Sequence, residues 1–377
     1  MIHFLKYFFI SILIFSCHSN SSKENRNIIE SKKSSLKYTK NVEMITYGDY
    51  QEVIIKNPIN QYEIIYYLVD SHKDIPKNLE GKKIIRTPLN KIVVTSTTHI
   101  AMLELLGVEK SLIGFPQTYF VSSEKTRQRI DSGLIKELGN VQQLNTEILL
   151  IIKPDLIMTF EISGSNKTMQ ELDKKGFNIL VNTDWLEETP LGRVEWIKLY
   201  GALFDKQEKA DSLFKSIEKN YLDAVKIAQK ATKKPSILSG IVFNDVWNLP
   251  AGKSLEAQLL KDANTHYLWS DTEGTGSLSL SIEAVLNKAK DADIWVASGI
   301  YTSRTDLTNS NGLYQYFNPI KKKQVYSYAH LRGKTGGYIY FETAPIRPDL
   351  VLKDLIKIAH PELMRHYDFT FYKRLEK

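Results

Sequence analysis

The stretch KIVVTSTTHIAMLELLGVEKSLIGF, residues 91–115, places an apolar strand, a helix and a second strand in direct succession. The first strand, residues 91–97, is rich in β-branched side chains, and the helix from about His99 to Leu106 ends at Gly107. The next strand begins at Ser111. Strands that alternate with helices through short links pair in parallel, so this stretch predicts an α/β fold.

The same alternation continues toward the C-terminus and recurs after Pro235. It predicts two small lobes with mainly parallel sheets. Between them, apolar residues fall three or four apart from Arg193 to about Thr232, which indicates one long amphipathic helix. We therefore expect an N-terminal lobe over residues 89–192, a connecting helix over 193–232 and a C-terminal lobe over 233–377.

Residues 41–88 show a different pattern, in which apolar and polar side chains alternate around a turn at Asn57-Pro58. This alternation predicts an antiparallel β appendage that precedes the N-terminal lobe.

The N-terminus reads as an export signal, because Lys6 precedes an apolar run from Tyr7 to Phe15 that is too short to span a membrane. Residues 14–17, Ile-Phe-Ser-Cys, resemble a bacterial lipobox. We expect residues 1–16 to be removed as a lipoprotein signal peptide and Cys17 to carry the lipid. The alternative is an ordinary signal peptide with a chance cysteine. Residues 17–40 are polar and predict a flexible tether.

Composition excludes several classes of function. Cys17 is the single cysteine, so disulfide, zinc–cysteine and thiol-redox sites within one chain are excluded. The net charge is +7, but acidic and basic residues are interspersed, which indicates a solvated surface and not a nucleic-acid face. No hydrolase elbow, zinc-protease motif or phosphate-binding loop occurs, so we expect no enzyme and no cofactor.

Four segments together resemble the ferric-siderophore and cobalamin class of ABC-transporter substrate-binding proteins, over roughly residues 91–363. They are ILLIIKPDLIMTF (148–160), WNLPAGKS (247–254), SIEAVLNKAKDADIWVAS (281–298) and RPDLVLKDLIKIAHPEL (347–363). The segment LGRVEWIKLYGALFDKQEKADSLF (191–214) resembles the start of the family's connecting helix. The resemblance implies two lobes joined by a stiff helix, with a ligand held between them and little lobe movement.

Ligand-binding residues are expected on the loops after the strands, since the carboxyl ends of parallel strands carry the helix N-termini. The candidates are Thr98, His99, Gln117, Tyr119, Glu161 and Trp185 on the first lobe and Trp247, Tyr301, Arg304, Arg332, Tyr338 and Tyr340 on the second.

Several candidates have a structural alternative. Trp185 and Trp247 could be core residues, His99 could cap a helix, and Arg304 and Arg332 could be surface charges. Tyr338 and Tyr340 are two residues apart in GGYIYFE, so in an extended segment both would point to one side, which could face either the groove or the core.

The resemblance also implies partners. In the family one surface glutamate of each lobe docks on arginines of the permease, and Glu147 and Glu283 match that pattern. The alternative is that each only benefits from the dipole of the helix that it opens. We expect a monomer at the cell envelope, held by lipid on Cys17 at the periplasmic face or the cell surface.

The ligand is expected to be a metal chelate. Lys253, Arg304, Arg332 and Lys334 near the groove favour an anionic ferric siderophore. Cobalamin would use aromatic walls, and haem would use a ligand such as Tyr301 or His330. A bare zinc or manganese site would need His99, His266 and His330 to converge, and we expect no metal site of this kind.

Overall fold

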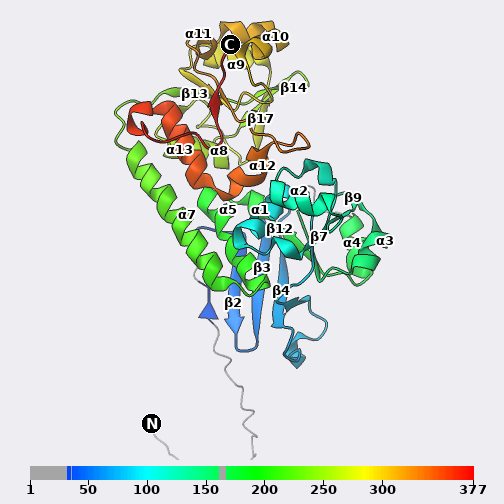
Figure 1. Ribbon diagram of the computed structural model, residues 1–377. Coiled ribbons are helices and arrows are strands. Elements are labelled where there is room, and N and C mark those ends of the chain that lie inside the picture. The colour runs from blue at the N-terminus through cyan, green and yellow to red at the C-terminus, as the bar shows by residue number, and fades with distance from the viewer. Residues whose placement is uncertain (1–31, 35, 161–166) are drawn as a thin grey trace, which may run out of the picture.

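The computed structural model describes residues 32–34, 36–160 and 167–377 and consists of two α/β lobes, a connecting helical segment and an N-terminal sheet (Figure 1). The expected signal sequence, Cys17 and Glu161 lie outside the described residues. Within these ranges, no helix has both the length and the apolar character that a membrane span requires.

The N-terminal lobe is built on five parallel strands in the order β12-β11-β6-β7-β8. Ile92 and Val94 belong to one apolar cluster and Val93 to another, so both faces of the sheet are covered. The strands are β6 (Ile92–Val94), β7 (Leu112–Phe115), β8 (Lys136–Glu137), β11 (Leu156–Phe160) and β12 (Ile179–Asn182). The helices are α1 (Thr97–Leu106), α2 (Glu124–Asp131), α3 (Thr146–Ile152) and α4 (Lys167–Lys174).

Helix α1 begins and ends where its sequence dictates. The Ser96 hydroxyl accepts the Thr98 backbone N–H at the N-terminus, and Gly107 closes the C-terminus at φ 77°. The start of α1 is thereby fixed at the carboxyl end of β6.

The N-terminal appendage is a five-stranded sheet in the order β1-β2-β3-β4-β5, visible in blue below the lobe in Figure 1. It is antiparallel as predicted except at its last pair, because β5 runs parallel to β4. Its inner face packs on the N-terminal lobe through side chains such as Val53, Tyr66 and Leu68. The strands are β1 (Lys32–Lys33), β2 (Val42–Tyr47), β3 (Tyr50–Asn57), β4 (Tyr62–Asp70) and β5 (Ile84–Thr87).

The connecting segment differs from the single helix predicted over residues 193–232. It consists of α5 (Pro190–Glu195), α6 (Ile197–Leu203) and the 22-residue α7 (Gln207–Ala228). Asp205 adopts φ 52° in the turn between the end of α6 and the start of α7. Gly201 lies so close to α7 that a Cβ atom there would be 2.7 Å from the Ala210 Cβ. The apolar periodicity therefore continues across a turn at which α6 packs on α7.

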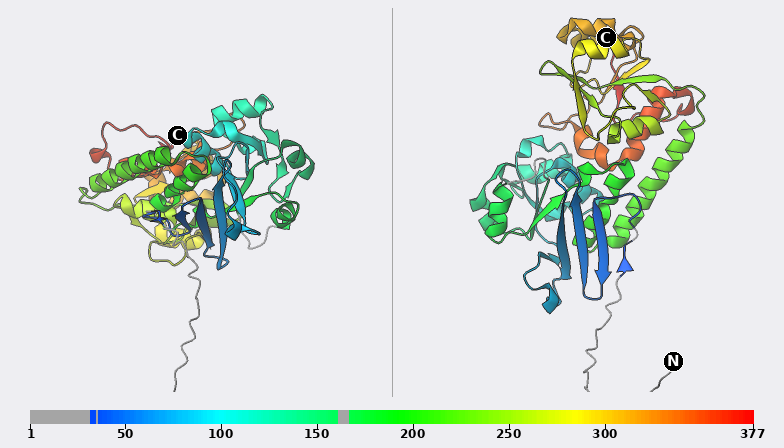
Figure 2. Two further views of the ribbon diagram at one scale, coloured as in Figure 1. Left: turned by 90° about the horizontal axis from the view of Figure 1, so that it is seen from below. Right: turned by 180° about the vertical axis from the view of Figure 1, so that it is seen from behind.

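Helix α7 links the lobes along one side of the molecule, where it packs against α13 (Pro348–Ala359) of the C-terminal lobe (Figure 2). At about 1.5 Å per residue it spans roughly 33 Å. Its buried stripe, Ala210, Phe214, Ile217, Tyr221, Ala224 and Ala228, passes from one lobe's core to the other's.

The C-terminal lobe combines a parallel sheet, β16-β13-β18, with an antiparallel sheet, β14-β15-β17. The strands are β13 (Ser236–Ser239), β14 (Ile241–Phe243), β15 (Val246–Pro250), β16 (His266–Tyr267), β17 (Ser277–Leu280) and β18 (Ile294–Val296). The helices besides α13 are α8 (Leu255–Asp262), α9 (Ile282–Ala289), α10 (Arg304–Ser310), α11 (Asn318–Lys321) and α12 (Ile339–Thr343).

Near the C-terminus the short strand β19 (Tyr326–Ser327) pairs antiparallel with β20 (Lys373–Arg374). Val325 makes one parallel bridge to Trp295 of β18. The strand near the chain terminus, β20, therefore pairs with β19 and not with the parallel sheet.

Candidate functional site

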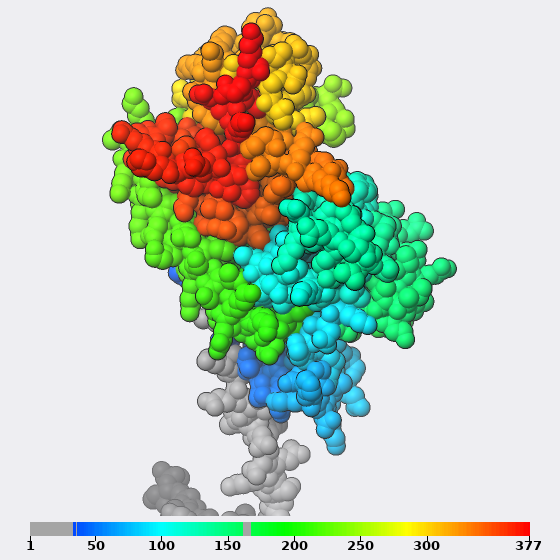
Figure 3. All heavy atoms as spheres, in the orientation of Figure 1, coloured from blue at the N-terminus to red at the C-terminus, as the bar shows by residue number. Residues whose placement is uncertain are grey.

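A cavity of about 570 Å³ lies between the two lobes, at the carboxyl ends of β6, β7 and β11. The C-terminal lobe closes it with residues 335–341, which lead into α12. In Figure 3 orange atoms of this segment meet cyan and green atoms of the N-terminal lobe. The lining residues are Thr95, Ser96, Thr97, Phe115, Pro116, Gln117, Tyr119, Phe120, Val141, Phe160, Thr335, Gly336, Gly337, Tyr338 and Phe341.

Aromatic side chains dominate the cavity. Six of the lining residues are Phe or Tyr, and no described lining residue carries a charge. Three of them, Tyr119, Phe120 and Phe341, are each at least half exposed, so their rings are available to a bound molecule. A wall of this kind offers broad apolar contact with a few hydroxyl and amide groups that can orient a ligand.

Of the predicted ligand-binding residues, Gln117, Tyr119 and Tyr338 line the cavity. The Gln117 side-chain amide donates to the Tyr119 hydroxyl at 3.2 Å, so the two act as one polar group on the wall. Thr98 does not line the cavity; it lies in the first turn of α1, where its hydroxyl bonds that of the lining residue Ser96 at 2.9 Å.

Arg332 lies behind this wall and not in it. Its guanidinium carbon is 4.7 Å from the centre of the Tyr338 ring, and its side chain donates to the carbonyls of Ala329 and Ile300. It lines a neighbouring cavity between the lobes. The Arg332 guanidinium therefore orients the Tyr338 ring, and its positive charge lies behind that ring and not in the cavity wall.

The structure places several predicted ligand residues away from the cavity. Trp247 is fully buried in the C-terminal core, where its ring centre is 5.2 Å from that of Trp295. Arg304 donates to the Leu375 carbonyl, and Tyr301 packs against the same core. These residues were expected at the groove because they follow or precede strands, but the C-terminal lobe uses them for internal packing.

His99 lies in the interior of the N-terminal lobe, whereas Trp185 is partly exposed. His99 is 1% exposed, and burial lowers the pKa of its imidazole to about 4. Trp185 is half-buried and does not line the cavity, and its indole N–H has no partner among the described residues.

Tyr338 and Tyr340 do not share a side, contrary to the prediction from their spacing. Tyr338 precedes α12, whereas Tyr340 lies within it, so the segment is not extended. Tyr338 faces the cavity, while Tyr340 stacks on Tyr328 with ring centres 4.1 Å apart inside the C-terminal lobe.

None of the predicted basic groove residues lines the cavity. Lys253 pairs with Glu273, and Lys334 pairs with Asp131 at 2.9 Å. Four further lining residues were not predicted from the sequence, namely Phe115, Phe120, Phe160 and Phe341. Phe115 and Phe160 end the strand motifs SLIGF and DLIMTF, which is the signal that could have identified them.

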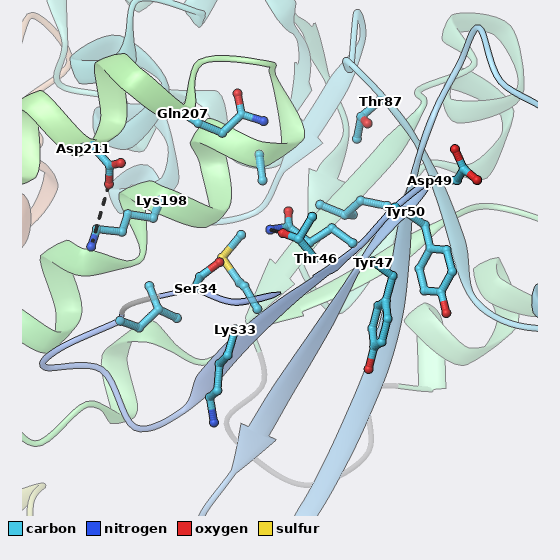
Figure 4. Close-up of a pocket in the computed structure, with 16 residues that line it drawn as sticks. Lys33, Ser34, Thr46, Tyr47, Asp49, Tyr50, Thr87, Lys198, Gln207 and Asp211 are labelled. Carbon is cyan, nitrogen blue, oxygen red and sulfur yellow. Dashed lines mark hydrogen bonds and ion pairs between the residues drawn. The ribbon is translucent and has the colours of Figure 1, made fainter. Parts of the chain in front are cut away.

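A second pocket, of about 540 Å³, lies between the β2–β3 hairpin and helices α6 and α7 (Figure 4). Leu36, Met44 and Leu68 contribute apolar side chains, and Lys198 forms an ion pair with Asp211 at 3.8 Å. All of its walls come from the appendage and the start of the connecting segment, so it is separate from the inter-lobe cavity.

Glu147 and Glu283 are both exposed and occupy equivalent positions on the two lobes. Glu147 is in the first turn of α3, after the capping residue Asn145, and Glu283 is in the first turn of α9, after Ser281. Hydrogen bonds from its own backbone N–H and from Ser281 lower the pKa of Glu283, so it is ionised at neutral pH.

Three comparisons place this architecture among known proteins. An uncharacterized lipoprotein of Methanocaldococcus jannaschii is 26% identical and covers 94% of this chain and 89% of its own. Helicobacter pylori CeuE in a nickel–histidine complex superposes with a TM-score of 0.56 at 20% identity, over 84% of this chain and 91% of that one. A periplasmic heme-binding protein of Pseudomonas aeruginosa gives 0.54 at 18% identity, over 72% of this chain and 93% of that one.

The family described as periplasmic binding protein matches residues 92–330, which is more than half of the chain. The matched region contains both parallel sheets, the connecting helices and the N-terminal wall of the inter-lobe cavity. The chain therefore belongs to the periplasmic binding protein family, a family of binding proteins and not of enzymes.

Proposed function

We propose that this protein captures a ferric siderophore in the inter-lobe cavity and delivers it to the permease of an ABC importer. The observation that carries the proposal is the cavity of about 570 Å³ with six aromatic side chains at the strand ends. Its volume lies in the range that encloses a small organic ligand, roughly 300–1,000 Å³. The names of the H. pylori and P. aeruginosa structures, which record nickel–histidine and heme, support a metal complex as the ligand class.

The described part of the lining carries no charged residue, which bears on the choice of siderophore. Burying a net charge without a partner is costly, and no described lining residue is charged. Three hydroxamates cancel the charge of Fe³⁺, whereas three catecholates leave a strongly anionic complex. We therefore favour a ferric hydroxamate over the anionic chelate that the sequence alone suggested.

Haem is the second candidate, because the cavity offers tyrosine hydroxyls. Tyr119 and Tyr338 line it, and tyrosine is an established axial ligand of haem iron. Tyr301 and His330, the residues suggested from sequence, do not line the cavity.

Calorimetric titration of the purified, tagless protein tests the ligand class. The panel is a ferric hydroxamate, a ferric catecholate, haem, cyanocobalamin, and free Zn²⁺ and Mn²⁺. We expect saturable one-to-one binding of the ferric hydroxamate. If no chelate binds, the proposal is overturned. Binding of haem alone or of cyanocobalamin alone would identify that molecule as the ligand instead. Binding of free Zn²⁺ or Mn²⁺ alone would indicate a bare-metal site.

Delivery to a permease is proposed to use Glu147 and Glu283, one exposed carboxylate on each lobe. Reversing both charges, Glu147→Lys with Glu283→Lys, should abolish ligand uptake in cells while the solution affinity for ligand stays unchanged. Unchanged uptake would mean that the two glutamates only stabilise their helix N-termini.

Attachment to the membrane is proposed to occur through lipid on Cys17. A Cys17→Ser variant should move from the membrane fraction to the soluble fraction of the cell envelope. Retention in the membrane fraction would require another anchor.

A further inference from the structure

Glu342 connects the two lobes next to the cavity. It lies in α12 of the C-terminal lobe, is 2% exposed, and accepts the backbone N–H groups of Ser122 at 2.7 Å and Ser123 at 3.0 Å. These two residues precede α2 of the N-terminal lobe. One carboxylate thus satisfies two backbone donors across the lobe boundary.

The backbones of the two lobes also approach closely here. A Cβ atom at Gly333 would lie 2.6 Å from the Ser122 Cα, and one at Gly337 would lie 2.8 Å from the Phe120 carbonyl oxygen. Thr335 donates to the Val121 carbonyl, and Lys334 pairs with Asp131. Residues 333–342, which we name the latch segment, therefore dock directly on residues 120–123.

The latch segment also forms the C-terminal wall of the cavity. Tyr338 and Phe341 line the cavity, and Phe341 is the immediate neighbour of Glu342. Release of Glu342 from Ser122 and Ser123 would therefore displace both rings from the positions at which they can contact a ligand.

Docking changes the protonation of Glu342. Burial raises the pKa of its carboxyl from the ordinary 4.5 to about 7, partly offset by the two backbone N–H bonds, and the Glu104 carboxylate of α1 adds repulsion. The other charged groups lining the neighbouring cavity are Glu124, Arg127 and Asp131 on α2, with Arg332 and Lys334 on the opposite lobe. An undocked Glu342 faces water and regains its ordinary pKa.

The sign of the pH effect follows from this difference. Docking takes up a proton between pH 4.5 and 7. The contribution of Glu342 to the stability of the docked state is therefore complete below pH 4.5 and is lost as the pH rises through 7.

We propose that Glu342 is a positioning residue for the ligand site, and that it holds the latch segment on the N-terminal lobe more firmly at acidic than at alkaline pH. The inference concerns the inter-lobe cavity and rests on the proposed function only for its effect on ligand affinity.

Hydrogen exchange of the ligand-free protein tests the docking itself. Protection of the Ser122 and Ser123 amides, corrected for intrinsic exchange rates, should fall by roughly 30-fold between pH 5.5 and pH 8. Glu342→Gln cannot ionise and should remove this pH dependence, with lower protection at both pH values because the amide offers one acceptor oxygen to the two backbone N–H groups. Glu124→Gln, which neutralises an exposed glutamate of the same cavity, should retain it.

Equal protection at both pH values, or the same pH dependence in Glu342→Gln, would overturn the proposal that Glu342 holds the latch segment more firmly at acidic pH. Neither result depends on the ligand, so failure of the latch and failure of the ferric-siderophore proposal are distinguishable. If a chelate binds, its affinity should fall with rising pH in the wild type and in Glu124→Gln, and stay constant in Glu342→Gln. Constant affinity in the wild type would contradict the positioning role.

Discussion

His99 illustrates how burial decides the role of a single residue. His99 is the third residue of α1, close to the loop after β6, a position typical of a ligand-binding or capping histidine. The fold instead gives the cap to Ser96 and buries His99, whose Nδ1 has no hydrogen-bond partner among the described residues. A buried imidazole resists protonation, because the charged form loses its hydration.

This burial predicts acid sensitivity. The pKa of His99 is about 4 in the folded protein against 6.5 in the unfolded chain, so folding stability is lost as the pH falls below 6.5. Between pH 7.5 and 5 the loss due to His99 should be about 2 kcal/mol. Urea denaturation of His99→Gln should show a shallower decline, while His72→Gln, at an exposed site, should match the wild type. Identical declines in all three proteins would contradict this account.

At the level of elements, the segment after β1 forms a strap across the N-terminal lobe. The Glu195 carboxylate, fully buried, accepts the backbone N–H groups of Lys37, Tyr38 and Thr39 at 2.7 to 3.1 Å. Glu187 accepts those of Lys40 and Asn41. Residues 37–40 were expected in a flexible tether, but they are fixed to the lobe by consecutive backbone bonds.

The strap also reaches both halves of the molecule. Tyr38 packs against the cores of both lobes, and its hydroxyl donates to Glu218 of α7 at 2.6 Å. The strap therefore adds a second connection beside the connecting helices and should help fix the angle between the lobes.

Removing the charge of Glu195 should destabilise the protein. A glutamine at this site offers one acceptor oxygen and brings an N–H₂ group toward backbone donors, so we expect a loss of roughly 1–3 kcal/mol for Glu195→Gln. Glu188→Gln removes only an exposed ion pair with Lys40, and its effect should stay below about 0.5 kcal/mol. Chemical denaturation measures both. Equal effects would show that the strap bonds contribute no net stability.

The break in the connecting segment shows the limit of periodicity at this scale. Side chains from Trp196 to Phe204 and from Ala210 to Ala228 are buried with helical spacing, so the sequence pattern is continuous. Only the close packing at Gly201 and the left-handed conformation of Asp205 reveal the turn. Both are tertiary features that apolar spacing does not encode.

For the whole molecule, the lobes are joined by α7, the strap and the latch segment. Three links at separate places leave little freedom for a hinge movement. Solution X-ray scattering with and without a saturating ligand should therefore give radii of gyration that agree within about 1 Å. A contraction of several ångströms on binding would contradict a preformed cavity.

Much of the architecture was predictable because local patterns specify it. Strand–helix alternation gave both lobes, and the capping residues Ser96 and Gly107 fixed α1. The location of the cavity was predictable from the sequence, but only some of its lining residues were. Gln117, Tyr119 and Tyr338 follow from strand ends and loops, whereas Trp247 and Tyr340 became core residues through packing with Trp295 and Tyr328. The short α12, which separates Tyr338 from Tyr340, depends on contacts between lobes.

The position of the ligand is tested most directly by calorimetric titration of two matched variants with the chelate that binds the wild type. Tyr338→Ala removes an aromatic wall of the cavity, and Tyr316→Ala removes an exposed tyrosine that does not line it. We expect Tyr338→Ala to weaken binding by roughly tenfold or more, as the loss of about 1.5 kcal/mol of aromatic contact implies, and Tyr316→Ala to bind like the wild type. Wild-type affinity in Tyr338→Ala would contradict a ligand held between the lobes.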